Sequence, residues 1–96
     1  MFDKMKQLME VKKQAERIKK ELDAEVVEIN DAKGIKIAIS GSQNFRSVQI
    51  DADLIRAENK DSLERDLLRS MNAAIKRSQE ITAKKMSAVM PGLPGF

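Results

Sequence analysis

Three short segments in the middle of the chain carry apolar residues at every second position. The segments are residues 27–30, 35–40 and 47–50, and their apolar positions are Val27, Ile29, Ile35, Ile37, Ile39, Val48 and Ile50. Such alternation of β-branched and polar side chains is typical of strands with one buried face. Residues 30–34 and 41–44 contain Asn, Asp, Gly and Ser, which favour turns. The pattern predicts a three-stranded antiparallel meander with one apolar face.

On both sides of this predicted sheet, apolar residues recur every three or four positions, as they do in helices. Residues 2–23 contain an a/d seam formed by Leu8, Val11, Ala15, Ile18 and Leu22. A broad face in residues 61–89 contains Leu63, Leu67, Leu68, Met71, Ala74, Ile75, Ser78 and Ile81. Asp61, with Glu64 three residues later, predicts a capping box at the start of the second helix. The sequence therefore predicts an α+β protein with the element order α-β-β-β-α.

The remaining segments connect or end these elements. Residues 51–55 are expected to form an ordered turn or a single helical turn, with Leu54 and Ile55 folded back onto the core. Residues 91–96 are Pro-Gly-Leu-Pro-Gly-Phe, which does not continue a helix, so we expect a flexible tail. Residues 1–90 are accordingly predicted to form a single domain.

The predicted helices are longer than the predicted sheet. They measure about 33 and 40 Å at 1.5 Å per residue, whereas strands of about six residues span about 20 Å. The apolar seams therefore continue past the sheet, and a contiguous exposed apolar strip is unusual on a soluble monomer. We predict a two-fold homodimer. The residues assigned to the core or to dimer contacts are Leu8, Val11, Ile18, Leu22, Ile35, Ile37, Ile39, Val48 and Ile50.

The composition argues against an enzyme. The chain has no Cys and no His, which removes disulfides, thiolate sites and the commonest metal ligand and general base. Asp51 and Asp53 are interpreted as turn or capping residues, because no further metal ligands converge on them. Ser40, Ser42 and Ser47 have no partner base. We therefore expect no catalytic site, metal, cofactor or small-molecule substrate.

No stretch of the sequence approaches the ~20 consecutive apolar residues of a membrane span. Residues 1–6 contain neither the apolar core nor the cleavage site of a secretory signal, so we expect a cytoplasmic protein. A membrane-surface protein is an alternative, since Phe2, Met5 and Met9 accompany lysines in the predicted first helix. We nevertheless expect no membrane partner.

Positive charge is concentrated in the two predicted helices, whereas the predicted sheet is acidic. Residues 1–22 carry seven Lys or Arg against four Asp or Glu, and residues 61–96 carry six against four. Residues 23–60 carry five against seven, and the whole chain has a net charge of +3. This distribution suits an anionic partner contacted by the helices, although a merely solubilising helix surface has the same character.

Several motifs follow one another along the chain in a recognisable order. They are Gly34, Gly41, Val48–Asp51 followed by Leu54, Leu63–Leu67, Asn72, Ala74, Lys76-Arg77 and Met86, with a first helix that bears Met, Gln and Lys and a Pro/Gly tail. In this order and spacing the chain resembles the YbaB/EbfC family of bacterial nucleoid-associated DNA-binding proteins. The resemblance implies a homodimer with projecting helical arms, located in the cytoplasm at the nucleoid, that binds DNA with little sequence specificity. The chain departs from that family in two places: the turn at residues 30–34 is less Gly-rich than is usual, and the first helix is richer in Lys.

The resemblance and the charge distribution together predict contacts to duplex DNA on the helical arms. The candidate phosphate-binding residues are Lys12, Lys13, Lys19, Lys20, Lys76, Arg77, Lys84 and Lys85. A helix of about 33 Å matches roughly one turn of duplex. The chain has no Trp or Tyr, so a base-stacking platform for single strands is not expected. The alternative function is a protein-protein interaction module that docks a partner on its helical seams.

Overall fold

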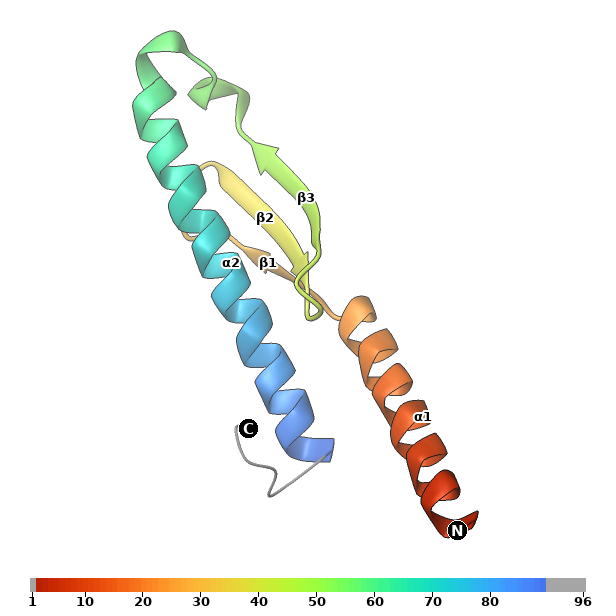
Figure 1. Cartoon of the computed structure of the whole chain (residues 1–96). Coiled ribbons are helices and arrows are strands. Elements are labelled where there is room, and N and C mark those ends of the chain that lie inside the picture. The colour runs from red at the N-terminus through yellow and green to blue at the C-terminus, as the bar shows by residue number, and fades with distance from the viewer. Residues whose placement is uncertain (1, 90–96) are drawn as a thin grey trace.

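The computed structural model describes residues 2–89 (Figure 1). The elements are α1 (Phe2–Ala24), β1 (Val26–Ile29), β2 (Ile35–Ser40), β3 (Phe45–Ile50), two short 3-10 turns (Ala52–Leu54 and Ala57–Asn59) and α2 (Lys60–Val89). The strands form one antiparallel sheet in the order β1-β2-β3. The predicted α+β class and the order α-β-β-β-α are therefore confirmed. The predicted tail, residues 91–96, lies outside the described residues.

The core lies between the sheet and α2, with the central strand β2 at its centre. Ile35, Ile37 and Ile39 of β2 alternate along the strand and are buried, as is Ile29 of the neighbouring β1. On α2, the facing positions are small residues four apart, which lie on one side of a helix. These residues are Ser70, Ala74 and Ser78, and each is fully buried. Their small side chains let the helix approach the sheet closely.

Most of the third strand, β3, is not covered by α2. In the antiparallel register, Ile37 pairs with Val48 and Ile39 pairs with Phe45, so these side chains share one face of the sheet. The main contacts of α2 are with β2 and β1. Val48 is consequently 49% exposed and Phe45 40% exposed, although their partners on β2 are fully buried. A single chain thus leaves the apolar face of β3 half uncovered.

A β-bulge explains why β3 begins earlier than the alternation predicts. Ala38 pairs with Ser47, but the next residue, Ile39, pairs with Phe45. Arg46 is therefore an extra residue on β3 with no partner on β2. The bulge interrupts the period of two, so the alternation identifies only residues 47–50 and misses the start of the strand.

Two details of the second connection differ from prediction. The predicted helical turn in residues 51–55 is present as the 3-10 turn Ala52–Leu54, and Leu54 packs against the core. Ile55, however, is exposed, so its predicted return to the core is wrong. The capping box is also wrong, because the 3-10 turn Ala57–Asn59 leads directly into α2, which begins at Lys60. Asp61 therefore lies inside the first turn and does not cap the helix.

The molecule is elongated, with extents of 67 × 21 × 16 Å. Figure 1 shows that α2 lies along the sheet and then continues past it, whereas α1 leaves the same end of the sheet and projects away. The buried residues of α1, Ile18 and Leu22, both lie in its C-terminal third. The expectation of two projecting arms is thus met in full by α1, while α2 projects only in its C-terminal part.

Candidate nucleic-acid interface

The N-terminal two-thirds of α1 is surrounded by solvent in a single chain. Every residue from Asp3 to Arg17 is exposed. Leu8 and Val11 continue the seam of the buried Ile18 and Leu22, but they are 70% and 54% exposed. Because no Pro or Gly interrupts this helix, it remains regular although little packs against it. The helix therefore presents a full circumference of side chains to any partner.

Basic residues are distributed around α1 in two groups. At about 100° per residue, Lys13 and Lys20 lie on one side of the helix, and Lys12 and Lys19 lie roughly 100° further round. All four are exposed. The structure therefore brings the predicted DNA-contact residues of α1 into two rows rather than one surface.

Lys6 and Arg17, which are not among the predicted phosphate contacts, complete the first of these rows. Together with Lys13 and Lys20 they follow the spacing i, i+7, i+11, i+14, which keeps side chains within about 60° of each other on a helix. We call these four residues the α1 basic row. It spans about 21 Å, or about six base-pair steps of duplex. The helical spacing of the four residues is visible in the sequence and identifies them without a structure.

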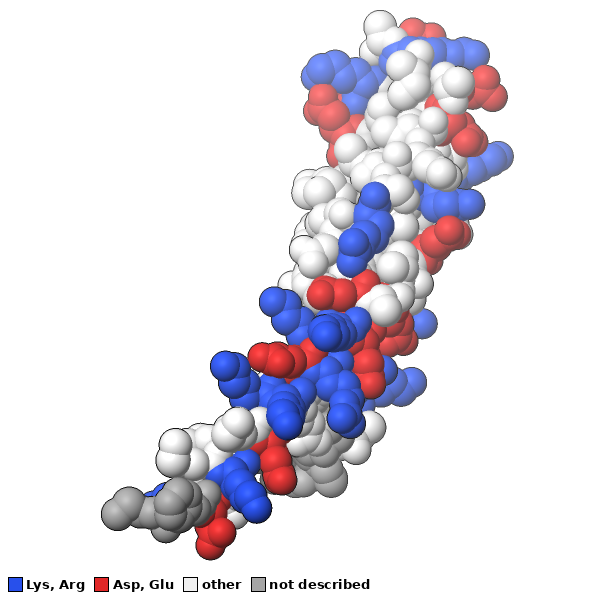
Figure 2. Space-filling view, turned by 90° about the vertical axis from the view of Figure 1, so that its right-hand side faces the viewer, with Lys and Arg blue, Asp and Glu red and all other residues white. Residues whose placement is uncertain are grey.

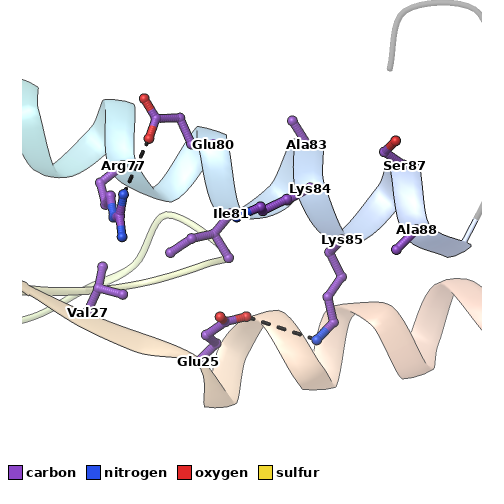
Figure 3. A pocket seen from close by; sticks show the side chains of 10 residues that line it. All are labelled: Glu25, Val27, Arg77, Glu80, Ile81, Ala83, Lys84, Lys85, Ser87 and Ala88. Atoms are coloured by element: carbon purple, nitrogen blue, oxygen red, sulfur yellow. Dashed lines mark ion pairs between the residues drawn. The ribbon is translucent and has the colours of Figure 1, made fainter.

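The predicted basic residues of α2 do not all share a surface. Arg77, Lys84 and Lys85 line an open groove of about 770 Å³ that has α2 on one side and β1 on the other (Figure 3). Lys76 lies about 200° round the helix from the buried Ala74, which places it on the outer face. The groove collects three of the four predicted residues, and the fourth faces away from it.

Two of the groove residues are partly neutralised by neighbouring carboxylates. Arg77 Nη1 lies 3.7 Å from a carboxylate oxygen of Glu80. Lys85 Nζ lies 3.3 Å from Glu21, near the C-terminal end of α1, and 4.0 Å from Glu25, the residue after α1. Figure 3 shows the pair with Glu25. Such half-exposed pairs have modest individual strength and weaken with salt.

The other six predicted residues keep their charge free of such pairs. Within residues 2–89, no carboxylate lies within 4.0 Å of the amines in question. They are Lys12, Lys13, Lys19, Lys20, Lys76 and Lys84, and all are exposed. Figure 2 shows Lys and Arg, with some Asp and Glu between them, gathered over the lower half of one face, where α1 projects, while the middle of the upper half is mostly uncharged. The arm therefore carries an accessible positive field.

Over the described residues, neither helix is long and apolar enough to cross a membrane. The fold and the charged surface together define a small, elongated α+β protein with a protruding basic helix. The same fold occurs in the crystal structure of an uncharacterized protein from Helicobacter pylori, with a TM-score of 0.78 over 96% of this chain and 98% of that chain. The identity is 19%, and the likeness therefore concerns the fold alone.

The family is shown by the sequence comparisons. The model of the YbaB/EbfC DNA-binding family matches residues 1–93, and the chain belongs to this family. It is also similar to two proteins named nucleoid-associated protein, one from Dictyoglomus thermophilum and one from Dictyoglomus turgidum. Each is 29% identical over 94 residues, which cover 97% of this chain and 90% of the relative. The predicted resemblance is confirmed.

Proposed function

We propose that this protein binds duplex DNA at the nucleoid, with little sequence specificity, through the basic residues of its projecting helices. The observation that carries the proposal is the α1 basic row, since it lies on a helix that is exposed from Asp3 to Arg17. Membership of a DNA-binding family and similarity to nucleoid-associated proteins support the choice of DNA as the anion.

The proposed mechanism is neutralisation of phosphates with release of counterions. Lys residues outnumber Arg on α1 by six to one, and Lys is a compact point charge without the fixed fork that reads guanine. Such contacts position a protein on the duplex but carry no sequence information. Affinity is therefore expected to fall steeply with salt and to change little with sequence.

We further propose that the binding unit is a homodimer, as the family resemblance implies. The apolar residues left uncovered in one chain support this proposal. They include Phe45 and Val48 on β3, Leu68 and Met71 on α2, and Leu8 and Val11 on α1. A second copy that covers such surfaces would remove an exposed apolar area that is unusual for a monomer. It would also supply a second basic arm for the same duplex.

The proposal is tested by neutralising part of the α1 basic row. Lys13→Gln with Lys20→Gln removes two positive charges from the arm. The matched control is Lys33→Gln with Arg56→Gln, which removes the same charge from two exposed positions, one in the β1–β2 turn and one before α2. The slope of log affinity against log salt measures the number of phosphates neutralised.

We expect the arm variant to reduce the slope by about 0.9 for each lost contact, or about 3.6 for a dimer with both arms engaged. The control variant is expected to keep most of the native slope. Native protein that fails to bind duplex DNA at low salt, or binds it independently of salt, would refute the function. Equal effects of the two variants would remove α1 as the contact surface.

A protein-docking module is the second candidate, favoured by the exposed continuation of the α1 seam at Leu8 and Val11. It predicts a single protein partner that remains bound after nuclease treatment. It also predicts that Leu8→Gln abolishes the interaction, whereas the charge variants of the α1 basic row leave it intact.

A further inference from the structure

The direction of α1 relative to the sheet depends on a few non-covalent contacts. The helix ends at Ala24 and β1 begins at Val26, so one residue, Glu25, joins them. Residues Asp3–Arg17 are all exposed, and Ile18 and Leu22, in the last turns of the helix, are buried against the rest of the chain. Whatever holds these turns therefore determines where the α1 basic row points.

A directed chain of hydrogen bonds holds Asp23 at the end of α1. The hydroxyl of Ser42 donates to the Asp23 carboxylate. Its single hydrogen is thereby used, so in the 2.8 Å contact between Ser40 Oγ and Ser42 Oγ the hydroxyl of Ser40 must be the donor. The backbone N–H of Asn44 in turn donates to Ser40 Oγ over 3.1 Å.

This chain connects three parts of the molecule. Ser40 is the last residue of β2, Ser42 and Asn44 belong to the turn that follows, and Asp23 is on α1. Hydrogen bonds that run in one direction polarise each other, and a carboxylate at the end is the strongest type of acceptor. Ser40 is fully buried, so one member of the hydrogen-bond chain lies at a rigid position. The β2–β3 turn thus connects the end of α1 to the end of the central strand β2.

The β-bulge supplies a second contact to the same residue. Arg46, which has no partner on β2, donates from Nη2 to the backbone carbonyl of Asp23 over 2.9 Å. The carbonyls of the last helical turn have no partner within the helix, so this bond satisfies an otherwise free acceptor. Bulges re-aim side chains in this manner. Both ends of Asp23, side chain and backbone, are therefore held by the β2–β3 hairpin.

We propose that Asp23, Ser42 and Arg46 are positioning residues that hold the α1 arm at a fixed angle to the sheet, and that this angle contributes to DNA affinity. The inference rests on the proposed DNA-binding function. Through it, residues that need not touch DNA decide whether the α1 basic row and the basic residues of α2 meet the same duplex. A fixed arm loses less conformational freedom on binding than a swinging one.

The direction in which Asp23→Ala changes DNA affinity distinguishes an effect of positioning from an effect of charge. Asp23→Ala removes a negative charge from a basic arm, so charge alone predicts tighter DNA binding. Loss of the fixed angle predicts weaker binding, by at most about a hundredfold, which is the fold-change that corresponds to a hydrogen bond to a charged group. The matched control is Glu16→Ala, which removes the same charge from an exposed position on the same helix. It is expected to tighten binding slightly.

Ser42→Ala tests the same contact without changing any charge. We expect it to weaken DNA binding in the same direction as Asp23→Ala, while Ser42→Thr keeps a hydroxyl and restores most of the affinity. Urea unfolding of each variant establishes that the compared proteins are folded under the conditions of the binding assay.

The arm angle itself is measured by pulsed electron paramagnetic resonance without DNA. The chain has no Cys, so spin labels can be attached at Glu10→Cys on the arm and Gln49→Cys on β3, both exposed. Labelled protein is diluted with an excess of unlabelled protein, so that distances within one chain dominate. The doubly labelled protein with no further substitution is expected to give one narrow distribution of label-to-label distances. The same protein with Ser42→Ala or Asp23→Ala is expected to give a broader distribution.

An unchanged distribution in both variants would overturn the proposal. So would a broadened distribution with native DNA affinity, since the angle would then be irrelevant to binding. If the native protein binds no DNA, the proposed function fails separately, and the role of the angle in affinity fails with it. Broadening together with weaker binding, against tighter binding for Glu16→Ala, supports the inference.

Discussion

Ile37 and Val48 form a natural pair for testing the arrangement of the core. They are β-branched residues opposite each other in the register of β2 and β3, on the same face of the sheet. Ile37 has no exposed surface, whereas Val48 is 49% exposed. Truncation of each residue to Ala therefore compares the loss of a β-branched side chain at a position covered by α2 with the same loss at a position that α2 leaves half exposed.

The expected costs differ severalfold. Ile37→Ala removes three buried carbon atoms and leaves a cavity between β2 and α2, which typically costs about 2–5 kcal/mol. Val48→Ala removes two carbon atoms that are half exposed, at about 0.8 kcal/mol per fully buried group, so it should cost less than about 1 kcal/mol in a single chain. A domain with about 5–15 kcal/mol of total stability makes this difference readily measurable.

Urea unfolding at two widely separated protein concentrations is the appropriate assay. If a second copy covers β3, the cost of Val48→Ala rises towards that of a buried valine, and the unfolding midpoint depends on concentration. Gln49→Ala, next to Val48 but on the opposite face, is the control and should change stability little. A cost below about 1 kcal/mol for Ile37→Ala would refute the assignment of β2 to the centre of the core.

The remaining predictions concern the junction of α1, the β2–β3 turn and α2. A Cβ atom on Gly41 would lie 3.1 Å from Ile81 Cγ2 and 3.2 Å from the Leu22 carbonyl oxygen, so Gly41→Ala should destabilise the fold by about 1–3 kcal/mol. In thermal unfolding this is a fall of about 4–8 °C per kcal/mol, and an unchanged midpoint would contradict the close approach. The buried hydroxyl of Ser78 donates to the Ser40 carbonyl over 2.8 Å, so Ser78→Ala should cost about 1 kcal/mol in urea unfolding. Exposed Ser87→Ala is the control, and equal effects of the two serine variants would argue against this bond.

The contrast between β2 and β3 shows what the local hydrophobic pattern can and cannot predict about burial. Ile35, Ile37 and Ile39 alternate without interruption, and the structure buries all three. Val48 has the same local pattern but lies half exposed, because burial depends on where a distant helix crosses the sheet. Alternation marks the apolar face of a strand, but the position of α2 determines which part of that face is covered.

Some features of the candidate interface can likewise be predicted from the sequence, and others require the folded structure. The charge of the helices and the regular spacing of Lys6, Lys13 and Lys20 are properties of the sequence, because a helix converts spacing into direction. The pairing of Lys85 with Glu21 and Glu25 cannot be inferred from the sequence. The partners are about 60 residues apart along the chain and meet only when α2 folds back beside α1.

The order of the elements, the period of each and the family followed from the sequence alone, because hydrophobic periodicity and turn composition act over a few residues. Only the tertiary structure determined the bulge at Arg46, the packing of α2 over β1 and β2 but not β3, and the hydrogen bonds of the β2–β3 hairpin to Asp23. Each of these depends on contacts between segments distant in the chain, whose geometry is set by packing and hydrogen bonding in the folded protein.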